Sequence, residues 1–123
     1  MSPQPFSVGS DRVGAVDVIA VTGELDMNTA SELQEPLDAA LAGPGALLID
    51  LSSCEFIDST GIALIVRAWQ QLGGENGAGQ ARFALCGLND QVRRVLELTG
   101  LKASIETHPG REEALAALSG PST

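Results

Sequence analysis

Hydrophobic residues along the chain fall into short continuous runs that alternate with stretches in which they recur every three or four positions. Continuous runs are typical of β-strands, and the second spacing is typical of amphipathic helices. The pattern predicts strands at residues 6–8, 16–21, 46–51, 82–86 and 103–106. It predicts helices at residues 28–42 and 59–72, a third helix capped by Asn89 and closed by Gly100, and a fourth opened by Pro109.

Strands that alternate with helices predict an α/β domain. Residues 9–14 form the expected turn of an opening hairpin, and residues 22–26 are expected to leave the sheet after the second strand. The run at 46–51 follows a Gly-Pro-Gly turn and is expected to be the central strand. We therefore predict a mixed β-sheet opened by a hairpin, with about four helices packed against it. The length of 123 residues fits one domain spanning 1–123, with flexible ends at 1–4 and 119–123.

Two segments interrupt this regular pattern. The first helix has Asn28 or Thr29 as a candidate N-cap but carries Pro36 in its interior. A proline there removes a hydrogen bond, so we expect the helix either to kink or to start later, near residues 31–33. The glycine-rich residues 73–80 follow the second helix and lack the Lys and Ser/Thr of a phosphate-binding loop, so they are expected to be a flexible linker.

The charge of the chain is acidic and unevenly distributed. Seven Lys and Arg residues face sixteen Asp and Glu residues, which gives a net charge of -9. Such a chain repels phosphate backbones and anionic lipid, which argues against nucleic-acid and membrane binding. Between Val13 and Val66 there is no Lys or Arg, although nine acids occur there. A partner of this half should present positive charge, unless the acids only form a solvated surface.

The sequence also indicates where the protein resides. It contains no apolar window of about 20 residues, and its first ten residues do not resemble a secretory signal. We therefore expect a cytoplasmic protein. Cys54 and Cys86 are too few for a disulfide framework and lack metal-ligand spacing, so they are expected to be buried free thiols.

Candidate chemistry gathers where the parallel strands end, at residues 23–29, 52–61 and 87–90. Ser59 stands at the predicted start of the second helix, where its hydroxyl can cap free amides. An anion on Ser59 would meet the helix dipole and several unpaired amides. Gly61 is costly inside a helix, and its missing side chain would open the backbone to a close visitor. The alternative is that residues 58–60 are only a good helix cap.

Three motifs give the chain a resemblance to a known family. These are Asp58-Ser59-Thr60-Gly61 after the central strand, Gly23-Glu24-Leu25-Asp26 upstream, and residues 88–101, with the sequence LNDQVRRVLELTGL, downstream. In this order and at these intervals they resemble the anti-sigma factor antagonists, the bacterial single-domain members of the STAS domain family. The resemblance covers nearly the whole chain and implies a STAS-like fold.

The resemblance also implies a phosphorylation switch. In such antagonists the serine at position 59 is phosphorylated by an anti-sigma factor that is also a serine kinase, and a serine phosphatase resets it. The unphosphorylated form binds the anti-sigma factor and frees the sigma factor, and phosphorylation is expected to change this interface without refolding the domain. No cofactor is implied, and the chain is expected to be a monomer or weak dimer. The implied partner-binding residues are Glu24, Asp26, Met27, Asn28, Thr29, Asp58, Thr60, Gly61 and Asn89.

Other functions fit the sequence less well. An enzyme is not expected, because the one histidine, His108, is expected at a helix start and no Gly-x-Ser-x-Gly motif surrounds Ser59. Asp26 and Asp58 could share a cation, but no metal site is predicted. A receiver-type domain would use Asp50 or Asp58 as phosphate acceptor, although Lys102 is poorly placed for that chemistry. A further alternative is a scaffold subunit of a stress-sensing complex with the same STAS fold.

Overall fold

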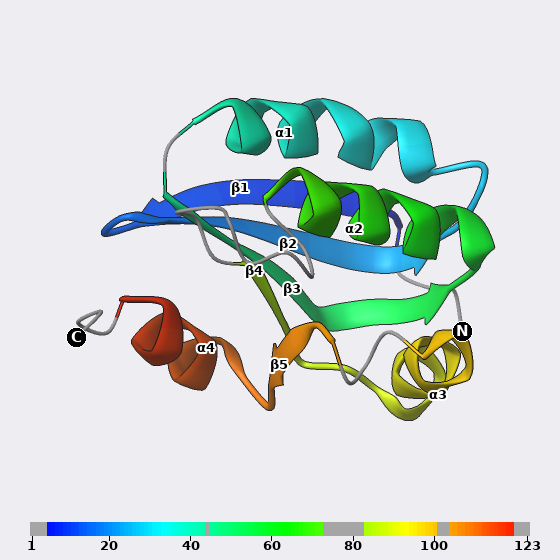
Figure 1. The fold of residues 1–123 in the computed structure, drawn as a ribbon. Helices are drawn as coiled ribbons and strands as arrows, with labels where there is room; N and C mark the ends of the chain where they lie inside the picture. The colour runs from blue at the N-terminus through cyan, green and yellow to red at the C-terminus, as the bar shows by residue number, and fades with distance from the viewer. Residues whose placement is uncertain (1–4, 44, 73–82, 101–103, 120–123) are drawn as a thin grey trace.

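The computed structural model describes residues 5–43, 45–72, 83–100 and 104–119. In these ranges, strands and helices alternate after an opening pair of strands (Figure 1). The strands are β1 (Ser7–Val13), β2 (Val16–Leu25), β3 (Ala46–Ile57), β4 (Phe83–Cys86) and β5 (Glu106–His108). The helices are α1 (Ala30–Ala42), α2 (Ser59–Gln71), α3 (Asp90–Thr99) and α4 (Arg111–Ser119).

The strands form one mixed sheet in the order β1-β2-β3-β4-β5. β1 is antiparallel to β2, and the other neighbours pair in parallel. β3 is the middle strand, as predicted, and its residues 46–51 are all buried. The α/β class, the opening hairpin and the four helices are confirmed.

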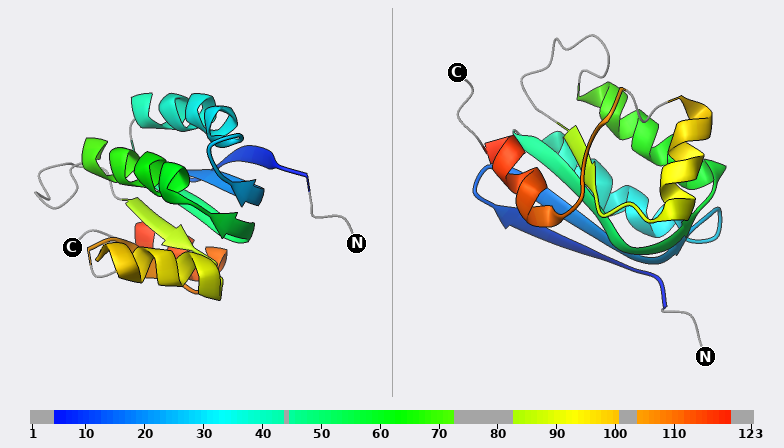
Figure 2. Two further views of the ribbon diagram at one scale, coloured as in Figure 1. Left: turned by 90° about the vertical axis from the view of Figure 1, so that its right-hand side faces the viewer. Right: turned by 90° about the horizontal axis from the view of Figure 1, so that it is seen from below.

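Helices cover both faces of the sheet. Figures 1 and 2 show α1 and α2 on one face and α4 on the other. The larger core cluster joins α1, α2 and α3 to the sheet through residues such as Leu33, Ile65 and Leu96. A smaller cluster lies under α4 and includes Leu48, Ala84 and Leu118. Burial of these two apolar clusters is the main force that holds the layers together.

Three strands differ in extent from the prediction. β1 is longer and turns at Gly14, β2 continues to Leu25, and β3 continues to Ile57. The expectation that residues 22–26 leave the sheet is therefore wrong as far as Leu25, which pairs with Ile57. Register shifts at 20/22 and 23/24 let the two strands stay paired through polar residues, because a bulge re-aims the side chains that follow it.

The last strand also lies further along the chain than predicted. β5 is Glu106–His108 instead of residues 103–106, of which residue 103 lies outside the described residues. His108 is thus a strand residue, and the expectation that it stands at a helix start is wrong. Its Nε2 lies 2.7 Å from Oε2 of Glu106, so the two end residues of the short strand contact each other through their side chains.

Helix α1 accommodates the proline in its interior. It begins at Ala30, earlier than the late start considered above, and continues past Pro36 to Ala42. Figure 1 shows α1 as one continuous coil. Thr29 occupies the N-cap position, but its side chain makes no capping hydrogen bond. The helix starts where it does because the amide of Ala30 donates to the carbonyl of Asp26 at 2.8 Å, which continues the preceding turn into the helix.

Helices α2 and α3 match their predictions closely. The expectation that Pro109 opens the fourth helix is wrong, because α4 begins two residues later, at Arg111. α2 starts at Ser59, and α3 is capped by Asn89 and closed by Gly100 in the left-handed conformation. Ser119, expected in a flexible end, closes α4. The predicted linker at 73–80, Lys102 and the ends 1–4 and 120–123 lie outside the described residues.

Candidate functional site

The first two predicted loops meet at the carboxyl ends of β2 and β3. The amide of Asp58 donates to the carbonyl of Leu25 at 3.1 Å, and the amide of Met27 donates to Oδ2 of Asp58 at 3.3 Å. Residues more than thirty positions apart in the sequence therefore share one surface. The parallel pairing of Leu25 with Ile57 brings them together, since it sets both loops at the same edge of the sheet.

Asp58, and not Ser59, caps helix α2. Oδ1 of Asp58 accepts hydrogen bonds from the amides of Thr60 at 2.9 Å and Gly61 at 3.1 Å. The prediction that the Ser59 hydroxyl caps the helix is wrong, and so is the expectation that these amides are unpaired. Ser59 is instead the first helical residue and is exposed to solvent.

The Asp58 cap predicts a measurable loss of stability. We expect Asp58→Ala to lower the free energy of unfolding by about 1 kcal/mol, since it removes the acceptor for two helix amides and for Met27. Asp58→Asn keeps a side-chain carbonyl oxygen at the same place and should cost less. Urea unfolding of both variants measures the difference. Equal losses would show that the charge of Asp58, and not its acceptor oxygen, stabilises α2.

Gly61 is a packing residue of the interior. A Cβ atom at this position would lie 2.7 Å from Cγ1 of Ile57 and 2.8 Å from Cγ of Leu25. The glycine thus lets α2 approach β2 and β3 closely. The expectation that its missing side chain opens the backbone to a visitor is wrong, because the space is filled by the protein's own core.

Asp26 organises the loop between β2 and α1. Its Oδ1 accepts hydrogen bonds from the amides of Asn28 at 2.9 Å and Thr29 at 3.2 Å. Thr29 Oγ1 accepts a hydrogen bond from the amide of Asp26 at 2.9 Å and donates to the carbonyl of Glu24 at 2.8 Å. These local bonds satisfy the backbone of a tight turn. The turn leaves Met27, 75% exposed, at its tip.

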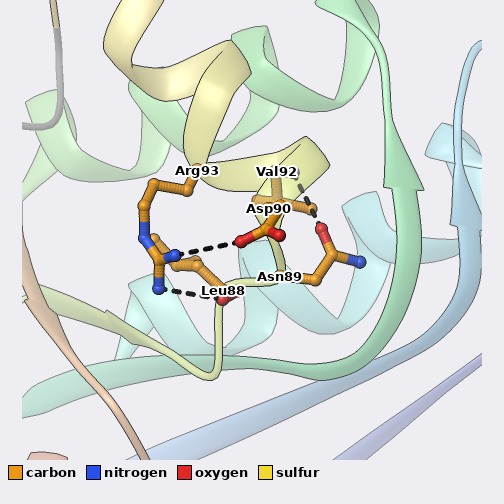
Figure 3. A network of polar contacts seen from close by, with 5 residues as sticks. All are labelled: Leu88, Asn89, Asp90, Val92 and Arg93. Carbon is orange, nitrogen blue, oxygen red and sulfur yellow. Dashed lines mark hydrogen bonds and ion pairs between the residues drawn. The ribbon is translucent and has the colours of Figure 1, made fainter.

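The third loop reaches the site through its side chains. Asn89 caps α3 by accepting a hydrogen bond from the amide of Val92 at 2.9 Å, as Figure 3 shows. Its Nδ2 also donates to the carbonyls of Cys54 and Glu55 at 3.1 and 3.2 Å. The polar atoms of Asn89 therefore bind within the domain, where they join the start of α3 to the end of β3.

Gln91 is a residue of this region that the sequence analysis missed. Its Oε1 accepts a hydrogen bond from the amide of Ile57 at 3.0 Å, and its Nε2 donates to the carbonyl of Ile57 at 2.9 Å. A glutamine in the first turn of a helix carries no signal of such a contact. The pair of bonds depends on how α3 crosses the end of β3, which the tertiary fold decides.

The surface around Ser59 combines acidic and apolar side chains. Ser59 and Met27 are exposed, and Asp26 and Asp58 are partly buried beside them. Glu24 and Phe56 are exposed on the paired ends of β2 and β3. Phe56, 40% exposed, is a large hydrophobic residue that the sequence analysis did not single out. Exposed apolar residues within a polar rim are typical of protein-binding surfaces.

Asp50 belongs to a separate polar cluster beside the core under α4. Its Oδ1 accepts hydrogen bonds from Ser52, and its Oδ2 lies 2.9 Å from Nε of Arg111. Burial alone would raise the pKa of Asp50, but the hydrogen bonds from Ser52 and Arg111 hold this pKa below its ordinary value of 3.8. The carboxylate thus links α4 to the sheet through Arg111, and Asp50 as a whole is 8% exposed.

The lowered pKa of Asp50 predicts a contribution to acid sensitivity. A carboxyl group whose pKa is lower in the folded state stabilises the fold above its unfolded pKa, and this stabilisation is lost as the pH falls through the folded pKa. We expect the unfolding free energy of Asp50→Asn to fall less steeply than that of the wild type below about pH 4. Denaturant unfolding across the pH range measures this. Parallel curves for the two proteins would contradict the assignment.

Both cysteines are buried and carry free thiols, as predicted. Burial raises the pKa of Cys54. Burial, with Asp50 nearby, raises the pKa of Cys86 to about 12. Both thiols therefore stay protonated at neutral pH, in which form they are poor nucleophiles.

Neither a metal-binding cluster nor a membrane-spanning helix is found in residues 5–43, 45–72, 83–100 and 104–119. Within these ranges, no group of three or more His, Cys, Asp or Glu residues is arranged to hold a metal ion. No helix in the same ranges is long and apolar enough to cross a membrane.

Comparisons with known proteins connect this geometry to a family. The family model described as "Mlab, STAS domain" matches residues 8–107. An anti-sigma-B factor antagonist of Listeria monocytogenes is 37% identical over 72% of this chain and 75% of its own length. The anti-sigma-F factor antagonist RsfB of Mycobacterium tuberculosis is 28% identical over 97% of this chain and 94% of its own length.

A similar solved structure also carries the name of an anti-sigma factor antagonist. The crystal structure of an anti-sigma factor antagonist from Mycobacterium paratuberculosis has a TM-score of 0.83 and is 33% identical, covering 96% of this chain and 97% of the other. The similarity therefore extends over nearly the whole of both chains. The chain belongs to the STAS domain family, and its relatives there are the anti-sigma factor antagonists.

Proposed function

We propose that this chain is an anti-sigma factor antagonist whose binding is switched off by phosphorylation of Ser59. In the unphosphorylated state it binds an anti-sigma factor, and the sigma factor held by that protein is released. The anti-sigma factor is also the serine kinase that modifies Ser59, and a separate serine phosphatase removes the phosphate. This is a binding and switching role in the cytoplasm, in which the chain catalyses no reaction.

The position of the Ser59 side chain carries the proposal. Ser59 is exposed at the start of α2, next to the Asp58 cap and to the turn that presents Met27. A kinase can reach a hydroxyl in this place without unfolding the helix. The names of the relatives support the choice of an anti-sigma factor as partner.

Electrostatics supplies the mechanism of release. A phosphate adds about -1.5 to -2 charge. The Asp58 cap already occupies the amides of Thr60 and Gly61, so the phosphate cannot use them without displacing the cap. The new charge therefore stays at the surface, beside Asp58. A partner that docks over the neutral hydroxyl would then meet repulsion and a desolvation cost, while the fold of the domain stays intact.

The same charges describe the surface that the partner should have. No Lys or Arg lies between Val13 and Val66, the half of the chain that supplies Glu24, Asp26 and Asp58. A complementary partner presents basic residues to these acids, together with an apolar contact for Met27. Charge complementarity of this kind raises the association rate and selects among partners.

Phosphosite mapping on protein recovered from its own cells tests the proposal. Trypsin makes no cut between Arg12 and Arg67, so cleavage after Glu55 and Glu75 should be used to isolate residues 56–75. We expect acid-stable phosphate on Ser59 whose amount changes between stressed and unstressed cells. A Ser59 that is unmodified in every condition would refute the switch, and an acid-labile phosphate would point to an acyl phosphate on an aspartate instead.

A further inference from the structure

Strand β3 extends beyond the strand that follows it in the sheet. β4 pairs with β3 from Leu47↔Phe83 to Asp50↔Cys86, whereas β3 continues to Ile57. On its other side, β3 stays paired with β2 as far as Ile57. The end of β3, residues 51–57, therefore has a neighbouring strand on one side only. On the other side its backbone N–H and C=O groups need other hydrogen-bond partners.

Two amide side chains from α3 supply those partners. Asn89 donates to the carbonyls of Cys54 and Glu55, and Gln91 both accepts from the amide and donates to the carbonyl of Ile57. The four distances lie between 2.9 and 3.2 Å, which is the normal range for such hydrogen bonds. Gln91 thus makes the pair of bonds that a residue of a neighbouring strand would make.

The start of α3 is itself fixed by short-range bonds. Figure 3 shows the Asn89 side chain bound to the amide of Val92, and the Arg93 side chain bound to Leu88 and Asp90. Nη2 of Arg93 donates to the carbonyl of Leu88 at 3.2 Å, and its Nη1 lies 3.4 Å from Asp90. The two amide side chains are therefore carried on a turn that has hydrogen bonds of its own.

We propose that Asn89 and Gln91 act as an amide clamp that holds the Ser59 segment in its binding position. Ile57 is two residues before Ser59, and the intervening Asp58 amide is bonded to Leu25. The segment is thus held by β2 on one side and by α3 on the other. A segment that is already fixed loses less conformational freedom when a partner binds it. Asn89 and Gln91 are positioning residues, and their role in binding rests on the function proposed above.

The test compares Gln91→Ala and Gln91→Glu with two controls in the full chain. Gln70→Ala removes an exposed glutamine at the far end of α2, and Leu118→Ala destabilises the opposite face without touching the clamp. We expect about tenfold faster hydrogen exchange of the Ile57 amide in Gln91→Ala. The increase should be smaller in Gln91→Glu, which keeps an acceptor for this amide and loses only the donor to the Ile57 carbonyl. We also expect about five- to tenfold weaker binding to the anti-sigma factor recovered with the wild-type chain. Neither control should change either value.

Four outcomes would overturn the inference, in different ways. Unchanged exchange at Ile57 in both Gln91 variants would show that no clamp exists. If the Gln91 variants exchange faster at Ile57 but bind the anti-sigma factor like the wild type, the clamp is only a structural contact. The same conclusion follows if Leu118→Ala weakens binding as much as the Gln91 variants do. If the wild-type chain recovers no anti-sigma factor, the proposed function fails and the positioning role fails with it. In that case the exchange rates still show whether α3 holds Ile57.

Discussion

Replacing Ser59 by aspartate should strongly weaken binding to the anti-sigma factor, whereas replacing it by alanine should not. Ser59→Asp puts a carboxylate on an exposed position next to Asp58, in a half of the chain that has no Lys or Arg between Val13 and Val66. Like charges brought together in an interface cost several kcal/mol, so we expect binding to weaken about 100-fold. Ser59→Ala removes a hydroxyl that does not cap the helix and should change binding about twofold or less. Titration calorimetry measures both.

A charge placed elsewhere provides the control for this experiment. Ser119→Asp adds the same carboxylate at the exposed end of α4, on the other face of the sheet, and should leave binding unchanged. Part of the loss in Ser59→Asp should also be recovered at high salt, because salt screens exposed charges. Equal binding by the aspartate and alanine variants at position 59 would contradict the electrostatic mechanism of release.

Replacing Gly87 by alanine should cause a large loss of stability. Gly87 has a φ of 73° at the end of β4, and a Cβ atom there would lie 2.8 Å from the backbone N and Cα of Ser52. Backbone strain and overpacking each cost about 1–3 kcal/mol, so we expect a loss of about 3 kcal/mol in the free energy of unfolding. Urea or thermal unfolding measures it.

Gly100 offers a matched comparison for Gly87. It has nearly the same φ, 77°, but a Cβ atom there would meet nothing within 4 Å. Gly100→Ala should therefore cost about 1 kcal/mol, the strain of the left-handed conformation alone. The difference between the two variants isolates the contact with Ser52. If both glycines cost the same, the close approach of Gly87 to β3 does not matter for stability.

Local signals in the sequence predicted the elements well but their ends less well. The helical spacing of α2 and the Asn89 and Gly100 signals around α3 come from short-range chemistry that any tertiary fold preserves. The extensions of β2 and β3 run through polar residues such as Thr22 and Ser53, which pair with each other only because the strands are already side by side. Periodicity within one strand cannot show pairing with another.

The candidate site was predicted in outline and corrected in detail. The residues Asp58, Ser59 and Gly61 indicated the start of a helix and a place where another group comes close to its backbone. Both features are present: α2 starts at Ser59, and Leu25 and Ile57 lie against Gly61. Asp and Ser are equally good N-cap residues, so composition could not decide which one caps α2. Gly61 was recognised as costly in a helix, but its cost is offset by packing against Leu25 and Ile57 in the interior. The contact of Gln91 depends on tertiary structure and left no trace in the local sequence.

The amide clamp has a consequence for the order in which the protein matures on the ribosome. Each strand pairs with the one before it in the chain, so the sheet can grow from the N-terminus as the polypeptide is synthesised. By the time α2 is complete, the nascent chain already contains Ser59, Asp58 and the Asp26 turn. It still lacks Asn89 and Gln91, about thirty residues later, which fix the end of β3. With the function proposed above, we expect the Ser59 segment to acquire its final shape only after the third helix has emerged, so that recognition by the partner follows synthesis of most of the domain.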